Sequence, residues 1–337
     1  MFPDLLKSVA SEISSALQAI FMVSSSRHFW LYMLSYIVIA VVLYWMSRDR
    51  SEGGSLLRFI FPREIYTHPS VIMDLKFWLV IVVVVNIGLF GLLYTAVGIF
   101  SGLLERGIDL LGPGWSADRG GDVPGFGDRV VYTLIVTCCI DFGFFIMHFC
   151  QHKISWLWSF HKVHHSAEVL TPLTANRHHP VDYILGAATA IFLGSIGTVV
   201  FSRYHGVQID GYTILNTSAI HFVYYMSANM RHSHLWLSFG PWISKVFVSP
   251  AMHQVHHSVD DQHFDKNFGF VFSFWDRLFG CRYIALEKES IVVGLRPGER
   301  PYSGFIDAMV RPFSDSIGQF GSIRRWRRLQ YFQDGLK

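Results

Sequence analysis

The sequence has few charged residues, few cysteines and no marked excess of one charge. Only 16% of its 337 residues are charged, whereas a typical soluble domain has about 25%. The formal net charge of +3 is too small to indicate a nucleic-acid-binding surface. None of the four cysteines forms a Cys-x-x-Cys pair, which argues against a disulfide framework and against a cysteine-bound metal. The composition therefore does not fit a domain surrounded by water on all sides.

Two further signals are missing. The glycine-rich stretch at 112–128 lacks the Gly-Lys-Ser/Thr ending of a phosphate-binding loop, so we interpret it as an external connection. The N-terminus lacks a basic segment followed by a clean apolar core, so we expect no cleaved signal. Its apolar residues recur at helical spacing, which predicts an amphipathic helix lying on a membrane surface.

Long apolar runs, in contrast, are frequent in this chain. Hydrophobic residues make up 51% of it, and a helix needs about 20 apolar residues to cross a bilayer. The candidate spans are 29–46, 77–100, 130–147, 183–201 and 209–226. The predicted fold class is all-α: a polytopic membrane helical bundle of about four to five transmembrane spans with a cytoplasmic histidine-rich cap.

Charge in the loops predicts the orientation of these spans. The segment after the first span is rich in arginine, and the 101–129 loop has more acidic than basic residues. Because basic loops stay in the cytoplasm, the first of these segments is placed inside and the second outside. Counting spans from there puts the polar segments after 147 and after 226, and the basic segment 324–328, on the cytoplasmic face.

Three short pieces each contain two or three histidines: HFCQH at 148–152, HKVHH at 161–165 and HQVHH at 253–257. Histidines three or four residues apart share one face of a helix, about 6 Å apart, as two ligands of one metal must. Eight imidazoles exceed the needs of one ion, so the pattern predicts two metals. The candidate ligands are His148, His152, His161, His164, His165, His253, His256 and His257.

Asp141 lies seven residues before His148, on the same stripe of the third predicted span. A carboxylate within a bilayer is costly and seldom faces lipid. Asp141 therefore binds a metal, orients a histidine through its second nitrogen, or forms a helix–helix hydrogen bond. His178 and His179 precede Pro180, which predicts an extended or turning segment.

The residue types leave the metal open among zinc, copper, iron and nickel. Zinc would suit hydrolysis. A dinuclear, nearly all-nitrogen site at a membrane surface suits oxygen activation better, because two irons can share the electrons needed to cleave dioxygen. Zinc could still replace iron in purified protein.

Residues 130–285 resemble the fatty acid hydroxylase / sterol desaturase superfamily of membrane di-iron oxygenases. DFGFFIMHFCQH, LWSFHKVHHS and the segment SPAMHQVHHS are similar to its three histidine boxes. ANRHHPVD is similar to an Arg-x-His-Pro element, and NFGFVFSFWDRLFG is similar to the tail of the third box. The order and spacing of these motifs also agree with the family.

The resemblance implies that the eight box histidines bind two irons and that His232 joins them. Family members often have His-x-Asn at that point, whereas this chain has His234 in place of the asparagine, so His234 is a further candidate ligand. Asn267 is a candidate to bind or support the metals. Asp141 and His179 are the candidate catalytic residues.

The sequence predicts three regions. Residues 1–128 contain the amphipathic helix, two spans and the external loop, residues 129–285 form the di-iron catalytic domain, and residues 286–337 form a basic cytoplasmic tail. The predicted location is a bacterial inner membrane or the endoplasmic reticulum.

The predicted function is an oxygen-dependent oxidoreductase that hydroxylates or desaturates a C–H bond of a lipid, such as a fatty acyl chain or a sterol. O₂ is the co-substrate, and electrons come from an external b-type cytochrome or a ferredoxin with its reductase. The alternative is a metal-handling membrane protein or transporter. Such a protein needs ionisable groups spread through the bilayer depth, whereas here the histidines gather at one face.

Overall fold

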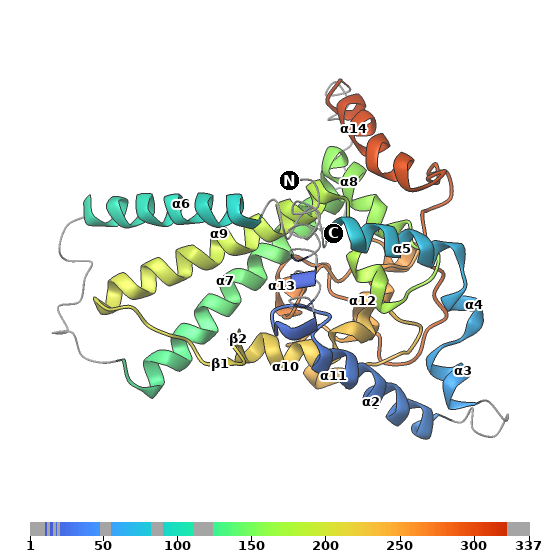
Figure 1. The fold of residues 1–337 in the computed structure, drawn as a ribbon, viewed down its shortest axis with the longest axis horizontal. Helices are drawn as coiled ribbons and strands as arrows, with labels where there is room; N and C mark the ends of the chain where they lie inside the picture. Colours follow the sequence, from blue (N-terminus) through green and yellow to red (C-terminus); the bar gives the residue numbers. More distant parts are fainter. Residues whose placement is uncertain are drawn as a thin grey trace, which may run out of the picture.

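The computed structural model describes residues 21–47, 55–81, 90–110 and 124–321, with a few isolated positions before residue 21. Across these residues the chain is mostly helical, as predicted (Figure 1). The one sheet in this part of the chain is an antiparallel pair of short strands, β1 (Thr213–Ile214) and β2 (Thr217–Ser218).

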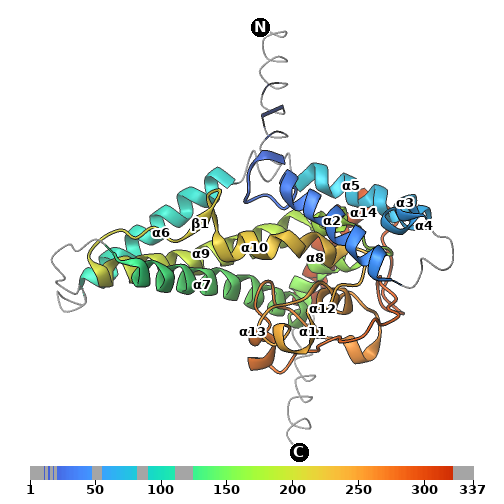
Figure 2. The ribbon, with the colours of Figure 1, turned by 90° about the horizontal axis from the view of Figure 1, so that it is seen from below.

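Three long helices lie side by side and extend from the rest of the molecule (Figures 1 and 2): α6 (Phe90–Leu110), α7 (Phe126–Lys153) and α9 (Pro180–His205). At 1.5 Å per residue, α7 is about 42 Å long and α9 about 39 Å, which exceeds the ~30 Å hydrocarbon core of a bilayer. In the described part of the chain, these two are the helices long and apolar enough to cross a membrane.

Glycines allow α7 and α9 to pack closely. A Cβ atom on Gly143 of α7 would lie 2.5 Å from Cα of Ala190 on α9, and one on Gly194 would lie 2.5 Å from Cγ1 of Ile140. The two backbones therefore approach at positions that no larger residue fits without movement. This contact fixes how the two ends of the helices meet at the histidine-bearing segments.

The remaining helices form the compact end of the molecule. Before α7 these are α2 (Trp30–Met46), α3 (Leu56–Ile60), α4 (Arg63–Tyr66) and α5 (Pro69–Val80). After α7 they are α8 (Ser155–His165), α10 (Ala219–Ala228), α11 (Gly240–Ile243), α12 (Pro250–His256), α13 (Phe274–Leu278) and α14 (Phe305–Gly321). Short 3₁₀ turns are η4 (Pro172–Asn176), η5 (Asn229–His232) and η6 (Asp261–His263).

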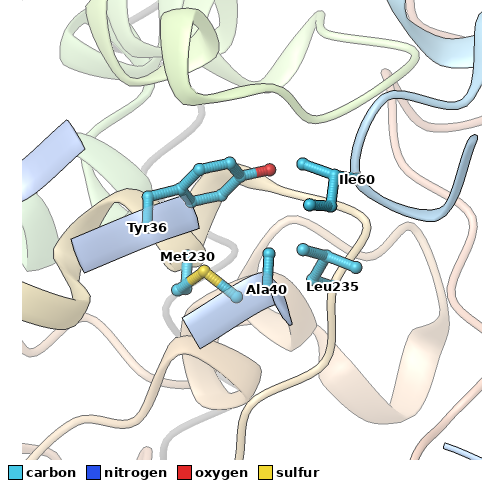
Figure 3. Packing of buried hydrophobic residues seen from close by; sticks show 5 residues of the cluster. All are labelled: Tyr36, Ala40, Ile60, Met230 and Leu235. Atoms are coloured by element: carbon cyan, nitrogen blue, oxygen red, sulfur yellow. The ribbon is translucent and has the colours of Figure 1, made fainter. Parts of the chain in front are cut away.

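A hydrophobic cluster connects the first described helix to the turn that carries His232. Figure 3 shows Tyr36 and Ala40 of α2 packed with Ile60, Met230 and Leu235. All five side chains are buried, and burying each of the larger ones stabilises the fold by about 1.5–3 kcal/mol. The segments on either side of His232 are therefore held against α2.

The structure changes the predicted set of spans. The fifth span, 209–226, is wrong: Leu215 and Asn216 have positive φ angles, so the chain turns back as the β1–β2 hairpin, and α10 has only 10 residues. The first span is α2, which at 17 residues is shorter than the predicted minimum. The centre of the second, 82–89, lies outside the described residues. The count of four to five spans and the cytoplasmic position of the cap remain predictions.

The region predicted as a tail contains a docked helix. Phe313 of α14 lies with its ring centroid 5.2 Å from that of Phe160 on α8, and Phe305 packs against Phe77 of α5 at 5.1 Å. The amphipathic helix predicted for the N-terminus, most of the 112–128 loop and the basic segment 324–328 lie largely outside the described residues.

Candidate metal centre

The histidine boxes meet at the compact end of the molecule. The last turns of α7 carry the first box, and the chain reverses at Ile154 so that α8 returns the second box beside it. Helix α12 brings the third. We call the first group the five-histidine cluster: its members are His148, His152, His161, His165 and His256, whose candidate ligand atoms all lie within 4.8 Å of one another.

A second group, the four-histidine cluster, lies next to the first. It consists of His164, His232, His253 and His257. Nε2 of His232 lies 3.0 Å from Nε2 of His253, 3.1 Å from that of His257 and 3.3 Å from that of His164. The structure thus brings together the eight box histidines and His232, and divides them into two sets.

Outer contacts orient several of these rings. Nδ1 of His148 donates to the carbonyl of Phe268 at 2.9 Å, and Nδ1 of His256 donates to that of Lys266 at 2.8 Å. A proton on Nδ1 leaves the lone pair on Nε2, which faces into the cluster. Hydrogen bonds from the second ring nitrogen to a carbonyl or carboxylate are usual in histidines that bind metals.

The donor set fits metal ions. The Nε2 atoms of His148, His152 and His161 are buried and have no hydrogen-bond partner. Buried polar atoms without a partner are costly, so several pointing at one place indicate a ligand. Lone pairs about 3 Å apart repel one another unless a cation lies between them.

Burial also keeps the ligands uncharged. It lowers the pKa of the histidines outside α7 well below 6.5, with neighbouring cationic groups as a further cause; these are His164, His165, His232, His253, His256 and His257. Neutral imidazole is the form that binds a metal, so no deprotonation is needed near pH 7. His253 has a different outer partner, because Nη2 of Arg231 donates to its Nδ1 at 2.8 Å.

Asp141 does not contact either cluster. Its carboxylate accepts hydrogen bonds from the backbone N–H groups of Val271 and Phe272, at 2.6 and 3.0 Å, and from Nε1 of Trp275 at 3.0 Å. The hydrogen-bonding alternative therefore describes this residue, with a loop rather than a helix as the partner. The loop includes Phe268, the carbonyl partner of His148, so Asp141 acts on the site through the backbone.

His179 has a structural position as well. It is the N-cap of α9: Nδ1 accepts from the N–H of Val181 at 3.2 Å, while Nε2 donates to the carbonyl of Met309 at 3.0 Å. Both ring nitrogens are occupied, which corrects the catalytic role expected for it.

His234 and Asn267 lie outside the two clusters. Nε2 of His234 donates to the carbonyl of Phe59 at 2.8 Å. The amide of Asn267 donates to the carbonyl of Met252 at 2.9 Å and accepts from the N–H of Tyr283 at 2.8 Å. Asn267 therefore has no free atom for a metal and instead holds the end of α12 in place.

Two residues near the clusters were not among the predicted site residues. The ring of His178 stacks on that of His164 with centroids 4.2 Å apart, and its Nδ1 lies 2.5 Å from Oδ2 of Asp182. Oδ1 of Asp182 lies 2.9 Å from Nδ1 of His161. The two adjacent histidines before Pro180 were the available signal, but sequence alone does not show which of them faces the metals.

A cavity of about 890 Å³ opens beside the clusters. His148, His161, His164, His232 and His253 line one end of it. From there it follows α7 and α9, where the lining residues are mainly apolar or small; they include Val136, Ile140, Phe144, Gly186, Ala190 and Gly194. A long apolar cavity that ends at a cluster of metal ligands can hold an extended hydrocarbon chain.

Comparison with known proteins agrees with this geometry. A family model described as fatty acid hydroxylase matches residues 133–281, which include both clusters. The chain belongs to the fatty acid hydroxylase / sterol desaturase superfamily. Together with the two membrane-length helices, membership of this family indicates an integral membrane protein.

Several curated proteins are similar to this superfamily member. Alkylglycerol monooxygenase of Danio rerio is 27% identical over 156 residues, which cover 46% of this chain and 31% of that protein. The ornithine lipid hydroxylase OlsE of Rhizobium tropici is 26% identical over 198 residues, covering 55% and 50%. Cholesterol 25-hydroxylase of Homo sapiens is 27% identical over 159 residues, covering 44% and 50%. The matches thus span half or less of these relatives. No solved structure matches the chain.

Proposed function

We propose that this protein is a membrane-bound, di-iron, oxygen-dependent oxidoreductase that hydroxylates or desaturates a C–H bond of a lipid. One observation carries the proposal: two buried histidine clusters lie side by side at the end of a long apolar cavity. The relatives that match this part of the chain are named as a monooxygenase and hydroxylases, and their named substrates include alkylglycerol, ornithine lipid and cholesterol.

The two clusters would each hold one iron. Nitrogen-rich sites also accept zinc or copper, and zinc could replace iron during purification, but only a redox-active metal serves this reaction. When bound, the iron pair supplies the reduction of dioxygen and the oxidation of carbon.

The reaction needs electrons from outside the cavity. In a hydroxylation one oxygen atom enters the C–H bond and the other leaves as water, while two electrons and two protons are consumed. In a desaturation both oxygen atoms leave as water, and two hydrogens are removed from neighbouring carbons. A b-type cytochrome, or a ferredoxin with its reductase, is the class of donor that fits.

The protein's own residues position the reactants. Asp182 and the carbonyl groups of Phe268 and Lys266 hold the imidazoles in one orientation. The apolar walls along α7 and α9 hold the hydrocarbon and exclude water from the oxidised carbon. Gly186 leaves room in this wall, because a Cβ atom added there would meet nothing within 4 Å.

The test is oxygen incorporation into lipid in membranes that contain the protein. We expect labelled dioxygen to give a labelled alcohol, or a new double bond with oxygen consumption, in the presence of a reductant. His257→Ala should lower turnover at least about a hundredfold because it removes a ligand, while His234→Ala, outside the clusters, should keep it. Gly186→Leu should fold but lose turnover of long chains. Full activity in His257→Ala, or lipid turnover without oxygen, would contradict the proposal.

A further inference from the structure

We infer that Arg27 binds an anionic head group, a carboxylate or a phosphate, of a single-chain lipid, and that the oxidised carbon lies close to that head group. The inference rests on the proposed function, because it assigns the lipid's direction in the same cavity. It concerns residues 23–28, which precede α2 and match none of the histidine motifs.

The segment around Arg27 is held firmly against the metal centre. Asn229, the first residue of the turn that ends at His232, donates to the carbonyl of Arg27 at 3.2 Å. The hydroxyl of Ser24 lies 2.7 Å from that of Thr217, and Tyr32 donates to the carbonyl of Ser24 at 2.9 Å. Arg27 is therefore placed by the backbone, and its side chain is free to serve another purpose.

The guanidinium of Arg27 makes no hydrogen bond or ion pair within the described part of the chain, and its Nη1 is buried. The other arginines of the compact interior differ in this respect. Nε of Arg177 lies 2.6 Å from Oδ1 of Asp74, and Arg231 donates to the carbonyl of Phe270 at 2.9 Å and to His253. An enclosed cation without a partner is costly.

The electrostatic surroundings of Arg27 lack an anion. Burial lowers the pKa of Arg27, and the nearby Arg231 lowers it further. Metal ions in the two clusters would add positive charge on the same side of the cavity. A ligand that carries a negative charge relieves this imbalance, and a guanidinium binds carboxylate or phosphate with two parallel hydrogen bonds.

The cavity places Arg27 and the metal ligands at the same end. Ser26, Arg27 and His28 line it together with His164 and His232. The other arm follows α9 from Asp182 to Thr198, a distance of about 24 Å at 1.5 Å per residue. This is longer than the ~15 Å of hydrocarbon in one leaflet, half of the ~30 Å core.

The far arm is suited to a tail and unsuited to a head group. Its polar side chains are mainly hydroxyls that already donate within α9: Ser195 to the carbonyl of Phe192 at 2.8 Å and Thr198 to that of Gly194 at 3.1 Å. A lipid bound with its tail in this arm has its head group at Arg27. The carbon beside the clusters is then within a few bonds of the head group.

Binding to ligand-free protein tests the head-group subsite without turnover. The probes are oleate and 1-oleoyl-lysophosphatidate, which separate carboxylate from phosphate, and the neutral lipids oleyl alcohol and 1-oleoylglycerol. We expect at least one anionic probe to bind about tenfold to a hundredfold more tightly than the neutral ones. Arg27→Gln should abolish the difference and Arg27→Lys should keep part of it. Arg282→Gln, outside the cavity lining, should keep all of it.

Thermal stability separates a ligand-binding role from a structural one. Because Arg27 has no internal partner, Arg27→Gln without lipid should have a Tm equal to or above that of the wild type, while oleate no longer raises it. A lower Tm for lipid-free Arg27→Gln, or equal binding of anionic and neutral probes by wild type, overturns the inference.

Product positions test the direction of the lipid. With saturated substrates of 16, 18 and 20 carbons, the oxidised carbon should stay constant when counted from the head group. A position that stays constant from the methyl end overturns the inference but leaves lipid oxidation intact. Absence of any oxygen-dependent lipid product contradicts the proposed function instead, so the two failures are distinguishable.

Discussion

Oδ1 of Asp182 lies 2.9 Å from Nδ1 of His161, and Oδ2 of the same carboxylate lies 2.5 Å from Nδ1 of His178. His161 belongs to the five-histidine cluster, and His178 stacks on His164 of the four-histidine cluster. Gln151 donates to the carboxylate at 2.6 Å and completes its surroundings. One side chain at the start of α9 thus orients imidazoles that face both clusters.

We expect Asp182→Asn to weaken metal binding about tenfold to a hundredfold, because an amide cannot accept hydrogen bonds on both sides. The measurement is the metal content per chain after equilibration with a graded series of chelator concentrations. Asp315→Asn is the matched control, since Asp315 pairs with Lys162 at a partly exposed position. Equal retention of metal in the two variants would show that Asp182 does not position the ligands.

The division into two clusters predicts separate metal losses. His152→Ala removes a member of the five-histidine cluster and His253→Ala a member of the four-histidine cluster. We expect each variant to fall from about two metals per chain towards one, and the double variant to fall towards none. Elemental analysis of anaerobically purified protein measures this.

His234→Ala provides the comparison for these two variants, because its ring binds the carbonyl of Phe59 and lies outside both clusters. It should keep the full metal content. A loss in His234→Ala equal to that in His253→Ala would mean that the two clusters are drawn with the wrong members.

The histidine boxes were predictable because their spacing reports a local property. His148 and His152 share a helical face wherever the helix lies, and charge in the loops placed the boxes on one side of the membrane. The roles of Asp141, His179 and Asn267 were not predictable, because each depends on a distant backbone group, such as the carbonyl of Met309 for His179.

The spans show the same limit. Apolar composition located α7 and α9, whose length follows from an unbroken apolar run. It failed at 209–226, because a tight turn at Leu215 and Asn216 interrupts an otherwise apolar stretch. Neither residue is a glycine, so the turn gave no strong signal. The cavity likewise depends on which small residues of α9 face away from α7, and this follows from packing rather than composition.

His28 predicts a pH dependence of stability. Its Nε2 accepts a hydrogen bond from the amide of Asn176 at 3.2 Å, which requires a neutral ring. Burial, with a smaller effect of Arg27, lowers the pKa of His28 from 6.5 to about 4. The unfolded state therefore binds more protons than the folded state between these values, and stability falls as pH decreases from about 6.5 to 4.

We expect the free energy of unfolding of the wild type, relative to His28→Gln, to decrease by up to about 3 kcal/mol over that range. The two proteins should differ by a constant amount above pH 7. The measurement is chemical unfolding in detergent at several pH values. A difference that is independent of pH from 4 to 7 would show that His28 becomes protonated as easily in the folded as in the unfolded chain.

Two glycines in the α7–α9 pair predict opposite effects of the same substitution. A Cβ on Gly143 would lie 2.5 Å from Cα of Ala190 and 2.8 Å from the carbonyl oxygen of Thr189, both of them backbone atoms that cannot move aside alone. A Cβ on Gly186 would meet nothing within 4 Å. Both positions are inside helices, where alanine is favoured over glycine by up to about 1 kcal/mol.

Gly186→Ala should therefore raise the free energy of unfolding by up to about 1 kcal/mol, since it gains helix propensity and has free space. Gly143→Ala gains the same propensity but must separate the two helices, and we expect a net loss of about 1–3 kcal/mol. Thermal unfolding of the purified variants measures both. Because propensity is common to the pair, the difference between them reports the close packing alone, and equal stabilities would mean that α7 and α9 do not touch at Gly143.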